Sequence, residues 1–371
     1  MTENKTVLKN DEKAIFEMRT LYEKYGYSQY KMSKFEEYDL YVRNKDFLVS
    51  DNIITFTDTN GKLMALKPDV TLSIIKNSDD STETLSKMYY NENVYRVSKG
   101  SHSFKEIMQT GLECIGRIDD YCIYEVLMLA CESLGNISPD YVLDISDLEI
   151  LSQVIEDSGV LGDSKAKLLK CIGEKNLGAI SEICEAENAD LLDLKTLVTT
   201  YGKPAEVIKT LKNLKCKKTA DAVSRLEKIT SELEKNGYGD KIRIDFSVIN
   251  DMNYYNGYVF KGFINGIASG VLSGGSYDRL MKKMGKKSGA IGFAVYLDLL
   301  QRLSENDRTY DVDTVLLYDD GADIDALNGA IKLLTSGGKS VMAQKCVPEK
   351  LKYNQLLKLN ERGVEIIENN A

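Results

Sequence analysis

The sequence predicts an α+β protein built on an antiparallel sheet, with a helical insertion and a short α/β tail. Two groups of strand-like segments, one before residue 119 and one after residue 242, are separated by a long helical stretch. A polar segment near residue 306 then precedes a short stretch of alternating strand and helix patterns. We therefore expect a core of residues 1–147 and 237–303, an insertion of residues 148–236, and a tail of residues 308–371.

The first part of the core begins with a helix. Residues 10–25 carry apolar side chains at helical spacing, at Ala14, Ile15, Met18, Leu21 and Tyr22. Strand-like patterns follow around Thr55 and at residues 64–66, 87–96 and 107–118. A helix with a largely apolar surface is expected at residues 120–134.

The insertion differs in composition from both of its flanks. It has few aromatic residues and many Leu, Lys and Glu, and its helical periodicity is broken at Gly162, Gly173 and Gly202-Lys203-Pro204. This pattern indicates an all-helical segment. Strand patterns then return at residues 243–248, 258–263 and 266–272.

The tail follows a polar linker at residues 304–308. Five segments alternate strand and helix patterns in chain order, at residues 312–318, 324–334, 340–344, 349–359 and 364–367. This alternation predicts a small parallel sheet. We interpret the tail as serving packing or assembly rather than RNA binding.

The composition is that of an ordinary globular protein and argues against several classes of function. The 371 residues are 43% hydrophobic and 28% charged, enough for two or three domains with a sizeable core. A net charge of −9 provides no basic footprint for a nucleic acid such as tRNA. The seven cysteines form no C-x-x-C pair and the only histidine is His102, so we expect reduced thiols in the cytoplasm and neither a metal nor a cofactor. No apolar run approaches the roughly 20 residues of a membrane span.

Two segments carry side chains that suit the charged ends of an amino acid. In Leu66-Lys67-Pro68-Asp69-Val70-Thr71 the proline forces an extended approach, after which Asp69 and Thr71 can point into a cleft from alternate positions. In residues 90–96, Arg96 offers a planar fork of donors that suits a carboxylate. Each residue alone is a weak signal.

Two further segments add polar groups. In residues 105–116, Gln109 and Glu113 are four residues apart, which places both on the same face of a strand. The fourth segment contains the phenols of Tyr254 and Tyr255. A lone strand glutamate more often lies on a solvated face and paired tyrosines more often fill a core, so the prediction of a ligand site depends on all four segments together.

The four segments occur in the same order as the histidine-binding motifs of histidyl-tRNA synthetase, a class II aminoacyl-tRNA synthetase, and resemble them. The stretches at residues 248–260, 273–280 and 290–300 also resemble the histidine-specific signature and motif 3 of that family. The resemblance implies the class II synthetase-like fold and a histidine pocket. In it, Asp69, Thr71 and Gln109 would take the ammonium group, Arg96 the carboxylate, and Glu113 with Tyr254 the imidazole. Asp69 stands where the synthetases carry a longer glutamate.

Two residues depart from the synthetase pattern where the phosphates of ATP would be held. An arginine follows the acidic residue of motif 3 in that family, but Asp298 is followed by Leu299. A second arginine, which attends the α-phosphate, is replaced by Asn250. Neither leucine nor asparagine supplies positive charge to a developing phosphoryl anion. The glycines from Gly270 to Gly275 lack the lysine of a phosphate loop and fit a bend between strand and turn.

A chain that keeps the histidine pocket and loses the phosphate clamps resembles the regulatory subunits of ATP phosphoribosyltransferase, over roughly residues 8 to 305. The resemblance implies a non-catalytic protein that activates the short catalytic subunit in histidine biosynthesis and binds L-histidine as the allosteric effector of feedback inhibition. The tail would then resemble a truncated anticodon-binding domain. Two alternatives stay open: a divergent histidyl-tRNA synthetase, or a histidine-sensing paralogue with another partner.

Self-association is also expected. Class II synthetases of this kind pair through their motif 1 region, where this chain has Phe35, Tyr38, Leu40 and Tyr41 next to a helix. These apolar residues suit a two-fold contact. We therefore predict at least a homodimer before any partner binds.

Overall fold

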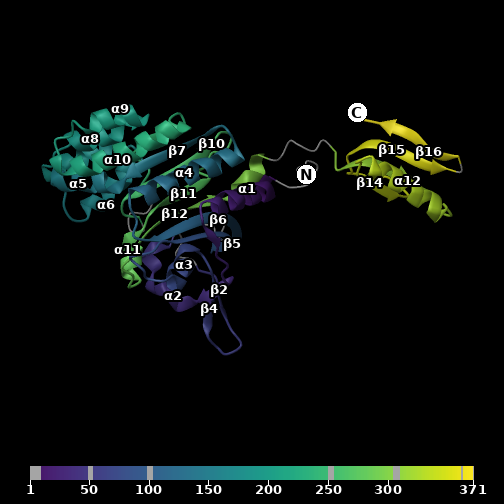
Figure 1. Cartoon of the computed structure of the whole chain (residues 1–371), viewed down its shortest axis with the longest axis horizontal. Helices are drawn as coiled ribbons and strands as arrows, with labels where there is room; N and C mark the ends of the chain where they lie inside the picture. Colours follow the sequence, from purple (N-terminus) through teal and green to yellow (C-terminus); the bar gives the residue numbers. More distant parts are fainter. Residues whose placement is uncertain are drawn as a thin grey trace. The chain divides into compact units, whose positions relative to one another are not determined.

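The structure is a computed structural model that describes residues 10–48, 53–97, 103–249, 255–303, 310–360 and 362–370. The chain forms two compact units, Met1–Leu303 and Ser304–Ala371. Figure 1 shows both units, coloured along the sequence. Each is described by itself.

A nine-stranded sheet organises the first unit. In spatial order its strands are β1 (Ser28–Gln29), β5 (Ser86–Val97), β6 (Phe104–Gly116), β12 (Gly289–Tyr296), β11 (Leu272–Ser276), β10 (Tyr258–Ile264), β7 (Tyr141–Asp147), β9 (Ile242–Asp245) and β8 (Tyr201–Gly202). The strands from β5 to β7 are antiparallel, whereas β1 pairs with β5 and β9 with β7 in parallel. The predicted α+β fold on a largely antiparallel sheet is confirmed.

Two long helices cover one face of this sheet. They are α1 (Asn10–Lys24) and α4 (Asp120–Ile137), which pack on each other and on the strands (Figure 1). Asp119 caps α4 by accepting a hydrogen bond from the amide of Cys122 at 2.9 Å. Leu112 and Cys114 of β6 point to this face and lie in the same buried cluster as Leu127 of α4.

Shorter elements lie against the other face of the sheet and form a second buried cluster. They are α2 (Tyr38–Arg43), α3 (Thr71–Asn77), α11 (Asp278–Lys283) and a three-stranded sheet of β2 (Phe35–Glu37), β4 (Leu63–Leu66) and β3 (Thr55–Thr57). This cluster joins Leu72 and Ile74 of α3 to Tyr90 of β5 and Leu280 of α11. Polar residues between the two layers form the site described below.

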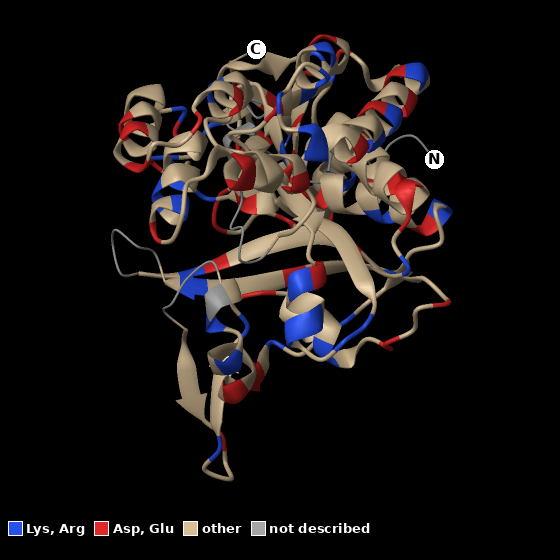
Figure 2. Ribbon diagram, turned by 90° about the vertical axis from the view of Figure 1, so that its left-hand side faces the viewer, with Lys and Arg blue, Asp and Glu red and all other residues tan. Residues whose placement is uncertain are grey.

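The helical segment between β7 and β9 contains six α-helices. They are α5 (Leu148–Ser158), α6 (Ser164–Gly173), α7 (Leu177–Glu187), α8 (Leu192–Thr199), α9 (Pro204–Leu211) and α10 (Ala220–Leu233). Asp147 caps α5 through the amide of Glu149 at 2.8 Å, and Pro204 occupies the first turn of α9, where its missing N–H costs no hydrogen bond. In Figure 2 acidic and basic residues are interspersed over these helices, with no continuous basic face among the described residues in that view.

The glycine-rich stretch before α11 differs from the sequence prediction. Residues 266–272 were expected to form a strand, but the strand is β11, Leu272–Ser276, and the preceding turn contains Gly266 with φ of +87°. Gly274 and Gly275 lie inside β11 because the strand is crowded: a Cβ at Gly274 would lie 2.5 Å from the backbone oxygen of Gly292. These glycines permit close packing within the sheet rather than a turn.

The second unit is a mixed four-stranded sheet in the order β14-β13-β15-β16, with one helix. Its elements are β13 (Val312–Leu317), α12 (Ile324–Ser336), β14 (Val341–Gln344), β15 (Tyr353–Asn360) and β16 (Gly363–Asn369). The predicted helix at residues 349–359 is wrong, and β16 runs antiparallel to β15. Both differences have one cause: Asn360 of β15 pairs with Gly363 of β16, so these segments form a hairpin, and Gly363 has φ of +118°.

No helix among the described residues is long and apolar enough to cross a membrane. The three-stranded sheet carries an exposed apolar surface. Phe35 is 47% exposed, Phe56 38% and Leu63 47%. The rings of Phe35 and Phe56 pack edge to face, with centroids 5.6 Å apart. Tyr41, expected to contribute to such a surface, is fully buried within the chain and cannot do so.

We predict that the full chain forms a homodimer through this surface, and that Phe35→Glu weakens the dimer by roughly 30-fold or more, as expected for the loss of an interface anchor. Light scattering at micromolar concentration measures this. Leu161→Glu, at a residue that is 72% exposed on the helical segment, is the matched control and should leave the dimer intact. A monomeric wild-type chain would contradict the prediction.

Candidate ligand-binding site

A cavity of about 450 Å³ lies on the face of the large sheet opposite to α1 and α4. Its floor is made of side chains that the strand register places in adjacent rows. Glu113 of β6 pairs with Gly292 of β12, and Gln109 pairs with Tyr296 in the same way. All four line the cavity. Because cross-strand partners share a face, the register of β6 and β12 decides which residues reach the cavity.

Glu113 is the most enclosed polar residue of the cavity and is only 2% exposed. Both of its carboxylate oxygens accept a hydrogen bond. Thr71 Oγ1 donates to Oε1 at 2.8 Å, and the hydroxyl of Tyr277 donates to Oε2 at 2.5 Å. Thr71 begins α3 and Tyr277 immediately precedes α11, so this one carboxyl group joins the sheet to both elements.

Burial raises the pKa of Glu113 to about 8, and the nearby Asp69 adds to this effect. The hydrogen bonds from Tyr277 and Thr71 oppose it. No basic side chain among the described residues forms an ion pair with this carboxylate. A cationic ligand group would therefore find an acidic partner that the protein itself leaves without positive charge.

Two glycines keep the space above the sheet open. A Cβ at Gly292 would lie 1.9 Å from Glu113 Oε2, and a Cβ at Gly111 would lie 2.6 Å from the hydroxyl oxygen of Tyr90. Even the smallest side chain would displace these groups, so both positions favour glycine, and Gly292 itself lines the cavity.

Asp69 and Thr71 reach the cavity from the start of α3, as the extended segment around Pro68 predicts. Asp69 Oδ1 accepts a hydrogen bond from the amide of Leu72 at 2.9 Å. Burial raises the pKa of Asp69, while this amide and the Arg96 guanidinium oppose the rise. Asp69 thus adds a second carboxyl group to the acidic end of the cavity.

Arg96 is fixed above the same end. Its Nε donates to the backbone oxygen of Pro68 at 3.0 Å, and it also lowers the pKa of neighbouring Tyr296, which burial raises. The segment that carries Pro68 is held by a buried ion pair, in which Nζ of the fully buried Lys67 lies 2.5 Å from Glu92 Oε2. This ion pair ties the 67–71 segment to β5, the strand that carries Arg96.

Six of the seven predicted site residues meet in this cavity: Asp69, Thr71, Arg96, Gln109, Glu113 and Tyr255. The seventh, Tyr254, lies outside the described residues, as does Asn250. Three tyrosines that were not predicted also line the cavity: Tyr277, Tyr90 and Tyr296. Tyr277 follows the Ser-Gly-Gly-Ser segment of motif 3, and its position at the end of that segment was the available signal.

Leu299, which stands in place of the motif 3 arginine, does not line the cavity. Leu299 lies in the 3-10 helix Leu297–Leu303 and packs against the core shared with α1 and α4. No group of three or more described residues could hold a metal ion. The described part of the cavity therefore offers groups for an amino acid and lacks the arginine of motif 3.

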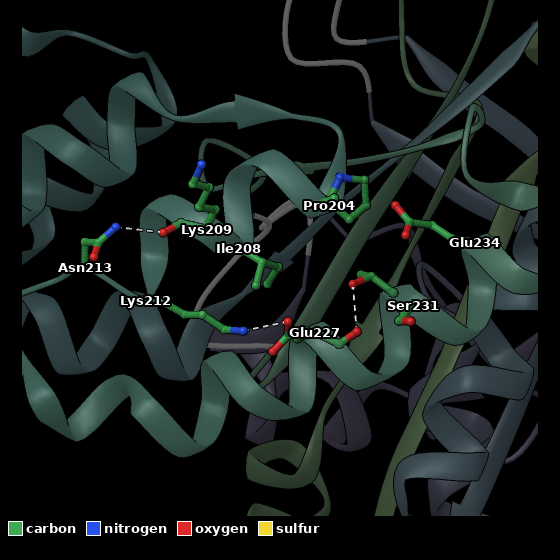
Figure 3. Close-up of a pocket in the computed structure, with 10 residues that line it drawn as sticks. Pro204, Ile208, Lys209, Lys212, Asn213, Glu227, Ser231 and Glu234 are labelled. Carbon is green, nitrogen blue, oxygen red and sulfur yellow. Dashed lines mark hydrogen bonds and ion pairs between the residues drawn. The ribbon is translucent and has the colours of Figure 1, made fainter.

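A second cavity, of about 540 Å³, lies between α9 and α10 (Figure 3). Pro204 and Ile208 face Ser231 and Glu234 across it, and one pair of opposite charges on its walls is joined, with Lys212 Nζ 2.6 Å from Glu227 Oε1. Its buried polar residue, Thr230, already donates a hydrogen bond to the backbone oxygen of Leu226 at 2.8 Å, and no buried carboxyl group of the described residues lines this cavity. We therefore take the cavity on the large sheet as the candidate ligand-binding site.

The fold and the site define the class of protein. A family model described as Histidyl-tRNA synthetase matches residues 6–300. A crystal structure from Bacillus halodurans, described as an ATP phosphoribosyltransferase regulatory subunit/histidyl-tRNA synthetase, aligns with a TM-score of 0.71 at 23% identity, covering 90% of this chain and 88% of that one. The chain thus has the class II, histidyl-tRNA synthetase-like fold.

A closer relationship comes from the sequence. The ATP phosphoribosyltransferase regulatory subunit of Clostridium kluyveri is 30% identical over 318 residues, which cover 81% of this chain and 80% of the relative. The chain belongs to the family of ATP phosphoribosyltransferase regulatory subunits, whose members regulate a catalyst rather than act as one. An ATP phosphoribosyltransferase complex from Thermotoga maritima contains a chain with the same fold, at a TM-score of 0.62 and 20% identity, covering 76% of this chain and 96% of that one.

The raised pKa of Glu113 predicts a pH-dependent stability. Its pKa rises from 4.5 in an exposed carboxyl group to about 8 in the fold. The unfolded chain therefore loses this proton first, and the folded state loses stability between about pH 5 and pH 8, by up to a few kcal/mol. Glu113→Gln removes the titrating group.

Thermal unfolding of both proteins from about pH 5 to pH 9 measures this effect. The melting temperature of the wild type should fall relative to that of Glu113→Gln as the pH rises, and the difference should level off above pH 8. A difference that is constant across this range would show that Glu113 ionises normally in the folded chain.

Proposed function

We propose that this chain activates the short catalytic subunit of ATP phosphoribosyltransferase and mediates feedback inhibition by binding L-histidine in the cavity on the large sheet. The family membership supports the regulatory part of this function. The single observation that supports histidine as the effector is the buried carboxyl group of Glu113, held open to the cavity by Gly292. We further propose that the chain acts in the cytoplasm, together with the enzyme that it would regulate.

Each polar part of histidine has a chemically suitable partner in the cavity. The imidazole carries N–H donors for Glu113, and the ammonium group suits the carboxylate of Asp69 and the side-chain oxygen of Gln109. The guanidinium of Arg96 suits the carboxylate of the ligand because two parallel hydrogen bonds can form. A ligand that lacks the imidazole would leave Glu113 buried without its additional donor, which selects against other amino acids.

Inhibition requires more than binding. Histidine must bind one state of the complex more tightly than the other, because a ligand with equal affinity for both states does not change the equilibrium between them. Glu113 joins β6 to the starts of α3 and α11 through its two hydrogen bonds. A ligand that competes for these bonds would change how the two short elements are held against the sheet, and this provides a route from the effector to the surface of the protein.

Glu113→Gln should shift inhibition of the reconstituted enzyme by histidine to concentrations higher by roughly 30-fold or more, since removing a buried charged partner of a ligand commonly costs 2 to 5 kcal/mol. The activated rate without histidine should barely change. The measurement is the steady-state rate of the catalytic partner against histidine concentration, with Tyr254→Phe, at the other residue assigned to the imidazole, as a second variant.

Glu106→Gln is the matched control for this experiment. Glu106 lies on the same strand, β6, but it is exposed and accepts hydrogen bonds from Tyr95 and Asn93 outside the cavity. The control should keep the wild-type response to histidine. If Glu113→Gln also keeps that response, the regulatory site lies elsewhere in the complex.

The competing function is that of a divergent histidyl-tRNA synthetase. We predict no histidine-dependent exchange between ATP and pyrophosphate, because Leu299 and Asn250 replace two arginines and their loss costs on the order of 10⁴-fold if the contributions add. The purified chain, with a histidyl-tRNA synthetase as positive control, provides the measurement. Exchange at a rate ordinary for a synthetase would restore this alternative.

The second alternative, a histidine sensor with another partner, is distinguished from the proposed function by testing whether the chain assembles with the catalytic subunit. Co-purification of the tagged chain with a short-form catalytic subunit should give a stable hetero-oligomer whose phosphoribosyltransferase activity depends on the chain. A chain that binds histidine yet neither binds nor activates that subunit would favour the sensor with another partner.

A further inference from the structure

The cavity extends beyond the residues that suit histidine. One row of cross-strand partners runs from Gly111 of β6 through Ala294 and Ser273 to Lys261 of β10. Neighbouring strands lie about 4.8 Å apart, so three steps place the backbone of Lys261 roughly 14 Å from that of Gly111. Lys261 lines the same cavity, at the end away from Glu113.

Lys261 is held in the cavity wall by the glycine beside it. A Cβ at Gly270 would lie 2.4 Å from Cε and 2.8 Å from Cγ of Lys261, so the lysine stem lies directly against the backbone of Gly270. Its ammonium group lies 5.6 Å from the centroid of the Phe263 ring. Among the described residues, Lys261 forms no ion pair.

The acidic residue nearest to Lys261 in the same row is Asp144 of β7. Burial and the neighbouring Asp245 raise the pKa of Asp144 to about 6, and Lys175 and Arg243 oppose this rise. No ion pair within 4 Å joins Asp144 to Lys261 in the described part of the chain. The ammonium group of Lys261 is thus available to a ligand.

Further donors line the cavity beside the stem of Lys261. Ser269 and Gly270 also line the cavity, and within the described residues neither their backbone amides nor the Ser269 hydroxyl takes part in a hydrogen bond. Two consecutive amides, a hydroxyl and an ammonium group make a set of donors with no acceptor provided by the protein. Sets of this kind bind anions.

We propose that Lys261, Ser269 and Gly270 form a second subsite of this cavity, which binds a phosphate group. A lysine acts as a compact point charge and suits phosphate, whose several oxygens can accept from the surrounding amides and hydroxyl. A carboxylate is matched better by the fork of Arg96 at the other end of the cavity. The subsite lies in the same cavity as the proposed histidine site but does not depend on histidine binding.

The test is isothermal titration of the full chain at constant ionic strength with inorganic phosphate, pyrophosphate and glycerol phosphate, and separately with histidine. We expect saturable binding of at least one phosphate probe. Binding of glycerol phosphate in preference to inorganic phosphate and pyrophosphate identifies a phosphorylated metabolite as the ligand, and the reverse preference identifies a free phosphate anion. Absence of saturable binding up to 20 mM for every probe overturns the proposal.

Two variants remove the subsite in different ways. Lys261→Met removes the charge and should weaken phosphate binding by roughly 10- to 150-fold, the range expected for one charge-assisted hydrogen bond. Gly270→Ala introduces a Cβ into the lysine stem and should weaken binding in the same direction, with the charge kept. Circular dichroism checks that both variants are folded, and unchanged affinity in the folded variants overturns the proposal.

Lys283→Met is the matched control, because Lys283 lies over the ring of Phe47, 4.7 Å from its centroid, at another edge of the cavity. It removes the same charge and should leave phosphate binding intact. An equal loss in both lysine variants would indicate attraction by net charge and would overturn the subsite. Histidine binding without phosphate binding would refute the subsite alone, and the converse would refute the histidine site alone.

Discussion

The buried carboxyl group of Glu113 is the constraint on which the site depends. A carboxylate that is 2% exposed and has no basic partner among the described residues is costly, and the fold reduces this cost with hydroxyl donors from Thr71 and Tyr277 rather than with a cation. The raised pKa favours the protonated group near neutral pH, and a cationic ligand would favour its charged form. The same two hydrogen bonds hold α3 and α11 against the sheet, so binding chemistry and local architecture share one residue.

The sheet provides the precision that such a site needs. Gly111 and Gly292 remove side chains where the cavity must be open, while Lys67 and Glu92 fix the segment that brings Asp69 and Thr71 over the floor. Because these positions lie on paired strands or are anchored to them, the sheet itself fixes the spacing of the polar groups. Leu299 packs against the core and does not reach the cavity, so the polar groups suited to an amino acid remain there.

Much of this arrangement could be predicted because it follows local periodicity. The spacing of Gln109 and Glu113 placed both on one face of β6, and the proline before Asp69 set the alternation that brings Asp69 and Thr71 to the cavity. Tyr277 was missed because its contact with Glu113 joins residues 164 apart in the sequence and depends on how β11 pairs with β12. The predicted position of β11 was wrong because glycines that permit close packing look like turn residues. A helix was predicted in place of β15 because its pairing with β16 cannot be seen in the periodicity of the segment alone.

The two faces of strand β6 have different roles, and this difference has a genetic consequence. Leu112 and Cys114 pack beneath α4, whereas Gln109 and Glu113, on the opposite face, reach the cavity. Changes on the helix-facing side loosen the sheet and so remove every activity of the chain at once, while changes at alternate positions alter only what the strand presents to a ligand. Under the proposed function, selection for strains that escape inhibition by histidine but still grow without added histidine would recover alleles at every second residue of this strand and spare the residues between them.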